Sequence, residues 1–128
     1  MDKKHVILYV DDEPTNLLLF KIHFQKKYTV LTGNSGSDGL ALLHSNPEVV
    51  VVVSDMKMPG MNGIEFIKAA KAEFPKIVFY ILTGFDITDE IAQALDDKLI
   101  NKYFSKPFNV GAIDASIEVA IESLTKEL

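Results

Sequence analysis

Five short apolar runs, separated by longer segments with helical periodicity, constrain the fold of this chain more than any other feature. The runs are rich in β-branched and aromatic residues and lack polar alternation; they cover residues 6–10, 29–31, 49–53, 77–82 and 103–104. Such runs are typical of strands that are covered on both faces. Because strands and helices alternate strictly, we expect a doubly wound α/β domain, with a five-stranded parallel sheet and helices on both faces.

The segments between the runs predict the five covering helices. The last segment is the clearest, because Ile113, Ile117 and Ile121 form an apolar stripe with acidic residues on the opposite side. The first helix should begin near Pro14, where the missing N–H costs little, and should bury Phe20. The other predicted helices cover residues 35–44, 62–74 and 86–99, and the last one covers 108–124.

Length, composition and charge exclude several classes of protein. The chain has 128 residues, which fits one domain over residues 1–128, and its 48% hydrophobic and 24% charged content argues against disorder. A net charge of -5 gives no attraction to nucleic acid or anionic membranes, so we expect neither as a direct partner. The absence of cysteine excludes disulfides and thiolate chemistry. The first apolar run is too short for a secretory signal or a membrane span, which favours a cytoplasmic protein.

Polar side chains follow four of the predicted strands. Asp11 and Asp12 come after the first strand, Asp55 after the third, Thr83 after the fourth and Lys106 after the fifth. In an open α/β sheet, ligands bind at the edge where the parallel strands end. These five side chains are therefore expected to meet at one edge of the sheet.

The residue types at this edge indicate a magnesium-dependent reaction with phosphate. Three neighbouring carboxylates repel one another unless a cation lies among them, and oxygen ligands without histidine or cysteine suit Mg²⁺. A carboxylate beside Mg²⁺ can attack phosphorus and form an aspartyl phosphate. An ammonium group and a hydroxyl group, such as those of Lys106 and Thr83, could then bind the phosphoryl oxygens.

Four motifs in this order resemble those of response-regulator receiver domains, the phosphorylatable switches of two-component signalling, including the chemotaxis regulators. The motifs are VDDEP at 10–14, SDMKMPGMNG at 54–63, LTG at 82–84 and YFSKPF at 103–108. The Asp-x-x-Met-Pro-x-Met-x-Gly stretch is highly specific, and the resemblance covers essentially the whole chain. It implies a flavodoxin-like fold with strand order 2-1-3-4-5.

The resemblance also implies a role for each acidic residue of the predicted site. Asp55 would be the phosphoacceptor. Asp12 would bind Mg²⁺ directly, and Asp11 would act on the metal mainly through water. The backbone carbonyl of Lys57 would complete the protein's share of the metal ligands.

The remaining motif residues would bind the phosphoryl group and report its presence. Thr83 would hydrogen-bond to the phosphoryl group and Lys106 would pair with it. Tyr103 would change its rotamer together with Thr83. A cis peptide between Lys106 and Pro107 would direct the lysine inward.

A few positions depart from the commonest pattern of the family without removing a catalytic group. Gly84 stands where alanine is usual, and Asn62 replaces a frequent aspartate but can still cap the third helix. Lys57 and Phe85 occupy the variable positions that tune the lifetime of the phosphoryl group. We expect Phe85 to shield it from water.

The implied phosphodonor is a sensor histidine kinase or a phosphotransfer protein. The implied output is a change in the surface formed by the fourth helix, the fifth strand and the fifth helix. This surface would contact a target protein, an output domain or a second copy of the chain in a phosphorylation-dependent homodimer. The chain is predicted not to be an enzyme; it would catalyse only its own phosphorylation and the hydrolysis of its own phosphoryl group. It is either a stand-alone receiver or part of a longer regulator.

Three other functions remain open. The first is an adaptor receiver that works without phosphate. The second is a phosphatase with an aspartyl nucleophile, which would need an acid two residues after Asp55, where Lys57 stands. The third is a flavin- or nucleotide-binding module, which would need a phosphate-binding loop in place of Asp11-Asp12-Glu13.

Overall fold

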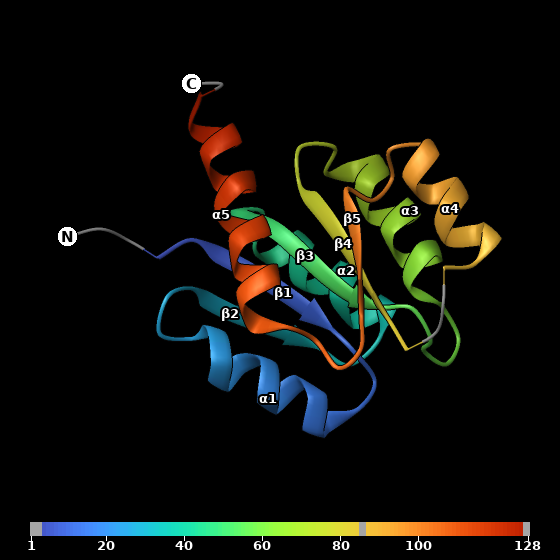
Figure 1. The fold of residues 1–128 in the computed structure, drawn as a ribbon, viewed down its shortest axis with the longest axis horizontal. Coiled ribbons are helices and arrows are strands. Elements are labelled where there is room, and N and C mark those ends of the chain that lie inside the picture. The colour runs from blue at the N-terminus through green and yellow to red at the C-terminus, as the bar shows by residue number, and fades with distance from the viewer. Residues whose placement is uncertain (1–3, 85–86, 127–128) are drawn as a thin grey trace.

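Helices and strands alternate along the whole described part of the chain (Figure 1). The computed structural model describes residues 4–84 and 87–126. In chain order the elements are β1 (Val6–Val10), α1 (Pro14–Phe24), β2 (Thr29–Gly33), α2 (Gly36–Ser45), β3 (Val49–Asp55), α3 (Gly63–Glu73), β4 (Val78–Thr83), α4 (Asp89–Asp96), β5 (Lys102–Ser105) and α5 (Val110–Lys126). No helix within the described residues is both long and apolar enough to span a membrane.

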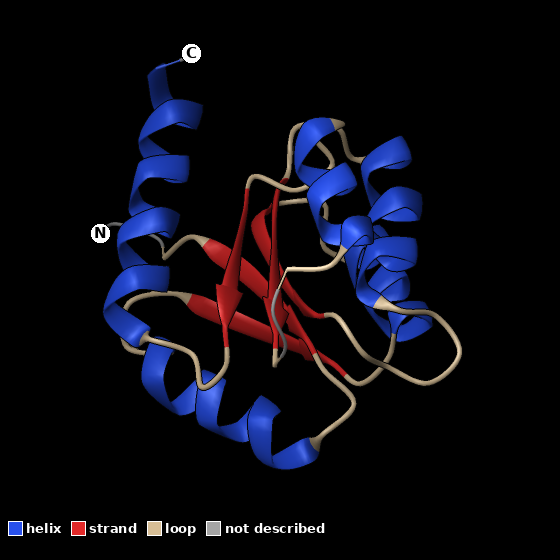
Figure 2. Cartoon of the chain, turned by 45° about the vertical axis from the view of Figure 1, so that its right-hand side comes forward, coloured by secondary structure: helices blue, strands red, loops and turns tan. Residues whose placement is uncertain are grey.

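The five strands form one parallel sheet in the order β2-β1-β3-β4-β5, which confirms the predicted doubly wound architecture. The sheet is the central layer, with α1 and α5 on one face and α2, α3 and α4 on the other (Figures 1 and 2). Alternate residues of each strand face opposite sides of a sheet. Accordingly, Tyr9 of β1 packs in the core beneath α1 and α5, whereas Leu8 packs in the core beneath α2 and α3.

Helices α4 and α5 begin at least two residues later than predicted. The fourth was expected over residues 86–99, but α4 begins at Asp89, because the Thr88 side chain accepts a hydrogen bond from the N–H of Ile91 and caps the helix. It ends at Asp96, and Lys98 follows with a positive φ of 60°. The expected first residue, Asp86, lies outside the described residues. The fifth helix, expected over 108–124, is observed over Val110–Lys126.

The carboxyl ends of the central strands extend further than the apolar runs indicated. Asp55 and Thr83 are the last residues of β3 and β4, not the residues that follow them. They belong to the strands because Asp55 is in register with Leu82 of β4, and Thr83 with Ser105 of β5. The backbone that carries these two polar side chains is therefore held by the sheet itself.

Helix α3 starts directly against the end of β3. Asn62 caps it as predicted, in a reciprocal arrangement with Glu65: each side chain accepts a hydrogen bond from the other residue's backbone N–H. The backbone N–H of Gly63 donates to the carbonyl of Met56 at 2.9 Å. A methyl group on Gly63 would lie 2.4 Å from the backbone oxygen of Asp55, so this close approach requires glycine.

Polar contacts attach α5 to the segment that connects α1 with β2. The Tyr28 hydroxyl donates to the Asp114 carboxylate at 2.6 Å, and the Lys27 ammonium forms ion pairs with Asp114, at 3.0 Å, and with Glu118. Partial burial raises the pKa of Asp114, but the hydrogen bonds from Tyr28 and Lys27 outweigh this effect and hold the pKa below its usual value. The carboxylate of Asp114 is thus a stabilising acceptor between two distant segments.

The close approach at Gly63 leads to a prediction about stability. Gly63→Ala should lower the free energy of unfolding by about 1–3 kcal/mol, because the new methyl group has no space beside Asp55. Gly111→Ala is the matched control, because its methyl group would meet only the Asn109 side chain at 3.4 Å; a gain of about 0.4–1 kcal/mol is expected. Urea denaturation measures both values. Equal stability of Gly63→Ala and wild type would contradict the prediction.

Candidate functional site

The five polar residues predicted to meet do lie at one edge of the sheet. Asp11 and Asp12 directly follow β1, Asp55 ends β3, Thr83 ends β4, and Lys106 directly follows β5. Because the strands are parallel, all of these positions fall at the carboxyl edge. The site is therefore assembled from four segments that are distant in the sequence.

The three carboxylates form a cluster that could hold a metal ion. Asp11, Asp12 and Asp55 each present one oxygen atom, and these atoms lie within 4.8 Å of one another; no other group of this kind occurs among the residues that the structure describes. Asp11 and Asp55 are buried, with 0% and 5% of their surfaces exposed. Buried like charges at this spacing repel one another strongly. The oxygen-only donor set fits a hard cation such as Mg²⁺.

Lys106 brings a positive charge to this cluster. Its Nζ atom lies 2.8 Å from Oδ1 of Asp55 and 3.9 Å from Oδ2 of Asp11. The peptide bond between Lys106 and Pro107 is cis, as the resemblance implied. The backbone N–H of Lys106 also donates to the Thr83 carbonyl at 2.8 Å, which continues the pairing of β5 with β4 past the end of the strand.

Burial raises the pKa of the Asp55 carboxyl. Removal from water is the largest effect and raises the pKa of this carboxyl, and the negative charge of Asp11 raises it further. The hydrogen bond from Lys106 acts in the opposite direction, but the pKa remains above its ordinary value. A cation among the carboxylates would favour the ionised form of Asp55, which is the form that can act as a nucleophile.

Asp11 is held by three hydrogen-bond donors. The hydroxyl of Tyr9 donates to Oδ2 at 2.6 Å, the side-chain amide of Asn16 donates to Oδ2 at 3.1 Å, and the backbone N–H of Glu13 donates to Oδ1 at 3.0 Å. Burial and the contact with Asp11 raise the pKa of Tyr9, so its hydroxyl stays protonated. Neither Tyr9 nor Asn16 was predicted from the sequence to take part in the site. The strand period of two places Tyr9 on the same face as Asp11, and this signal was available.

The residues predicted to act as a switch lie on neighbouring strands. Thr83 is buried, with 2% of its surface exposed, whereas Tyr103 on β5 is 37% exposed. Gly84 is exposed, and a methyl group there would meet only Lys106, at 3.9 Å, so an alanine would also fit. Lys57 is exposed in the loop after β3, and Phe85 lies outside the described residues.

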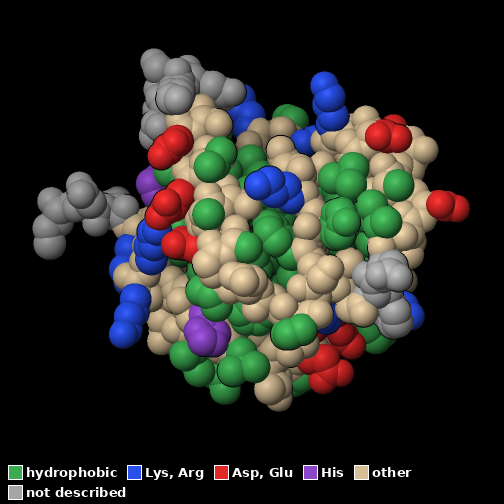
Figure 3. Space-filling view, in the orientation of Figure 1, with side chains coloured by type: hydrophobic (Ala, Val, Ile, Leu, Met, Phe, Trp, Pro, Cys, Tyr) green, Lys and Arg blue, Asp and Glu red, His purple; other side chains and the backbone are tan. Residues whose placement is uncertain are grey.

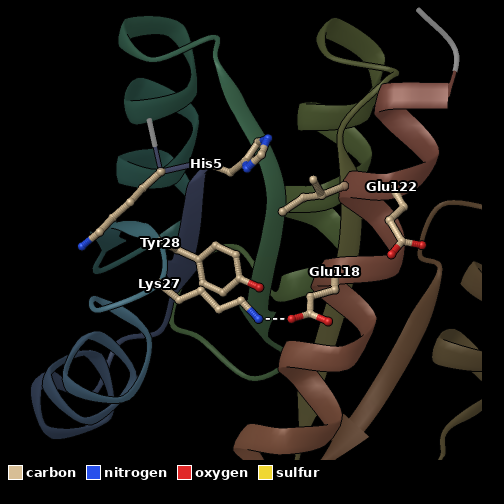
Figure 4. Close-up of a pocket in the computed structure, with 7 residues that line it drawn as sticks. His5, Lys27, Tyr28, Glu118 and Glu122 are labelled. Carbon is tan, nitrogen blue, oxygen red and sulfur yellow. Dashed lines mark hydrogen bonds and ion pairs between the residues drawn. The ribbon is translucent and has the colours of Figure 1, made fainter. Parts of the chain in front are cut away.

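A groove lies at the opposite end of the strands from the carboxylates. It has a volume of about 570 Å³ and is bordered by the segment before β1, the segment before β2, and α5 (Figure 4). An ion pair between Lys27 and Glu118 crosses it, and side chains of both charges line it. The groove shares no residue with the acidic cluster.

Comparisons with known proteins agree on one family. The family model "Response regulator receiver domain" matches residues 7–118. The hydrogenase transcriptional regulatory protein HoxA of Cupriavidus necator is 30% identical over 95% of this chain and 25% of its own length. Sporulation initiation phosphotransferase F of Bacillus subtilis is 29% identical over 88% of this chain and 90% of its own length. This chain therefore spans about a quarter of the first of these relatives and most of the second.

A solved structure resembles the whole fold. The response regulator receiver domain protein from Clostridium thermocellum superposes with a TM-score of 0.86 at 28% identity. The superposition covers 96% of this chain and 98% of that protein. The likeness thus extends beyond the strand order to the placement of the helices.

The raised pKa of Asp55 leads to a prediction about cation binding. Protons and Mg²⁺ compete for this carboxylate, so the affinity for Mg²⁺ should fall as the pH is lowered through the pKa of Asp55. Since burial raises this pKa, the fall should begin at a higher pH than an ordinary aspartate would give. Calorimetric titration with Mg²⁺ at a series of pH values measures the effect. An affinity that stays constant until ordinary aspartates become protonated would contradict it.

Proposed function

Because this chain belongs to the response regulator receiver domain family of two-component signalling, we propose that it is a switch that accepts a phosphoryl group on Asp55. The observation that carries the proposal is the surroundings of this carboxylate. Two further carboxylates, those of Asp11 and Asp12, lie close to it, and the Lys106 ammonium lies 2.8 Å from its Oδ1 atom. A nucleophile, a cation site and a fixed positive charge are the parts that phosphoryl transfer to a carboxylate needs.

The proposed donor is a phosphohistidine of a sensor histidine kinase or of a phosphotransfer protein. An oxygen of Asp55 forms a bond to phosphorus while the P–N bond of the donor breaks, and the electron pair of that bond returns to the imidazole nitrogen. Lys106 neutralises charge on the phosphoryl oxygens, and the Thr83 hydroxyl donates a hydrogen bond to one of them. Apart from this uptake and the later hydrolysis of its own acyl phosphate, the chain needs no enzymatic activity.

The proposed cofactor is Mg²⁺, held by Asp11, Asp12, Asp55 and the backbone carbonyl of Lys57. Three of these groups are the acidic cluster, and Lys57 follows Asp55 by two residues. When bound, Mg²⁺ supplies positive charge that neutralises the carboxylates and the phosphoryl oxygens. Asp12 is the proposed direct ligand, and Asp11, whose oxygens already accept hydrogen bonds, is proposed to act mainly through water.

The surface beside the carboxylates supports docking of a protein donor. A groove of about 510 Å³ adjoins Lys106; it is lined by Tyr9, Asn16, Leu19, His23, Gly84, Lys106, Pro107, Phe108 and Val110. The neighbouring face of α1 exposes the large apolar side chains of Leu18, Leu19 and Ile22 (Figure 3). Apolar groups that gather on a surface next to a reactive site are typical of protein contacts.

We propose that phosphorylation acts by a shift between two conformers. Thr83 moves toward the phosphoryl group, and Tyr103 turns from its exposed position into the space that Thr83 leaves. This changes the surface made by α4, β5 and α5, which would contact a target protein, an output domain or a second copy of the chain. The phosphoryl group supplies the differential contacts that such a shift requires.

Two of the positions flanking the site are proposed to set the lifetime of the phosphorylated form. These are Lys57, two residues after the acceptor, and Phe85, two residues after Thr83. A large apolar side chain at 85 would exclude the water that hydrolyses the acyl phosphate.

A receiver that signals without phosphate is the main alternative. The complete set of three carboxylates and Lys106 argues against it, because buried like charges without a binding role cost stability. An aspartyl phosphatase is less well supported. The position two residues after the nucleophile, where such an enzyme needs an acid for the leaving group, holds Lys57.

Phosphorylation of Asp55 can be tested directly. Acetyl phosphate with Mg²⁺ should add the mass of one phosphoryl group to the wild type and none to Asp55→Asn, which lacks the nucleophilic oxygen. Asp96→Asn, at an exposed position of α4, should be modified like the wild type. Intact-protein mass spectrometry measures the addition, and removal of Mg²⁺ by EDTA should abolish it. Modification of Asp55→Asn to the wild-type extent would refute the proposed acceptor.

The coupling between Thr83 and Tyr103 leads to a separate prediction. Thr83→Ala should still take up one phosphoryl group, but the NMR signals of the Tyr103 ring should no longer shift on phosphorylation, because the hydroxyl that responds to the phosphoryl group is gone. Thr29→Ala, at an exposed position of β2, should leave both responses intact. A full Tyr103 shift in Thr83→Ala would contradict the coupling.

A further inference from the structure

We propose that Tyr9 is a positioning residue of the cation site: its hydroxyl holds the Asp11 carboxylate in place and thereby sets the affinity for Mg²⁺. This inference rests on the proposed function, because it assumes that Mg²⁺ binds at Asp11, Asp12 and Asp55. It adds a residue outside the acidic cluster and outside the motifs that point to the family.

The position of Tyr9 is fixed by the core. It is the fourth of the five residues of β1, its side chain is fully buried, and its ring stacks on Phe20 of α1 with centroids 4.2 Å apart and planes 9° apart. The strand, the stacking partner and the burial together leave the ring no alternative orientation. The hydroxyl oxygen is therefore held in one position, 2.6 Å from Oδ2 of Asp11.

A tyrosine at this buried position needs an explanation that packing alone does not supply. A phenylalanine would fill the same space without a polar atom, and burying a hydroxyl costs free energy unless a partner compensates for it. Here the partner is a carboxylate, and a charged acceptor makes a stronger hydrogen bond than a neutral one. The hydroxyl of Tyr9 thus contributes to the position of Asp11 and not to the packing of the core.

Asp11 is the carboxylate of the cluster that is most completely held. Both side-chain donors, Tyr9 and Asn16, bind Oδ2, while the backbone N–H of Glu13 binds Oδ1. Without such donors, repulsion from Asp12 and Asp55 would favour rotation of Asp11 away from the cluster. Hydrogen bonds that orient the ligands of a metal site typically change its affinity by one to two orders of magnitude when they are removed.

Tyr9→Phe tests the inference, because it removes the hydroxyl and keeps the ring that stacks on Phe20. Its affinity for Mg²⁺, measured by calorimetric titration of the folded protein, should be about 10–100-fold lower than that of the wild type. Tyr80→Phe is the matched control: it also removes a buried hydroxyl, one that donates to the backbone oxygen of Ser116 at 2.9 Å, in the same core but away from the carboxylates. Its affinity should equal that of the wild type.

A double-mutant cycle separates positioning of Asp11 from a general effect on the fold. If Tyr9 acts through Asp11, Tyr9→Phe should cause no further loss of affinity in an Asp11→Asn background. An equal loss in that background, an equal loss in Tyr80→Phe, or unchanged affinity in Tyr9→Phe would each overturn the inference while leaving the proposed function intact. Failure of the wild type to bind Mg²⁺ would instead overturn the proposed function, and this inference with it.

Discussion

Repulsion among three closely spaced carboxylates is the constraint around which the rest of the structure is arranged. Two of them are buried, so water cannot screen their charges. The Lys106 ammonium offsets part of this repulsion, and the donors on Asp11 offset another part. The free energy of folding the two apolar cores offsets the repulsion that remains. Their packing on either side of the sheet fixes the ends of β1, β3 and β4 at one edge. A stable scaffold therefore holds an arrangement of charges that the proposed cation would make more favourable.

Most of the fold and the residues of the candidate site could be predicted from the sequence, because both depend on local patterns. The unbroken apolar runs specify buried parallel strands, and a parallel sheet brings the residues after each run to one edge. Asp11, Asp12, Asp55, Thr83 and Lys106 were located by this rule alone. The motifs around them then identified the family, and the strand order followed from the family.

Three features of the structure were not predicted from the sequence: the ends of α4, the attachment of α5 and the role of Tyr9. The ends of α4 follow from a capping threonine and a left-handed residue, which compete with an apolar periodicity that continues past them. The attachment of α5 through Tyr28 and Asp114 joins residues that are 86 positions apart. The sequence indicates Tyr9 only as an apolar residue of a buried strand, whereas the structure shows that its hydroxyl donates to Asp11. The contact of α5 could be found only in three dimensions, whereas the strand period of two already places Tyr9 on the same face as Asp11.

The edge position of β5 has a mechanical consequence. This strand has four residues and is bonded to β4 on one side; within the described residues no strand pairs with its other side. A displacement at the end of β4 can pass into β5 without breaking the pairing of β1 with β2 and β3, because those strands lie on the far side of β4. In the proposed switch, β5, which bears the exposed ring of Tyr103, can therefore shift while β1 and β3 keep the carboxylates in register. The proposed phosphoryl transfer at Asp55 and the proposed movement of Tyr103 would then take place on opposite sides of β4.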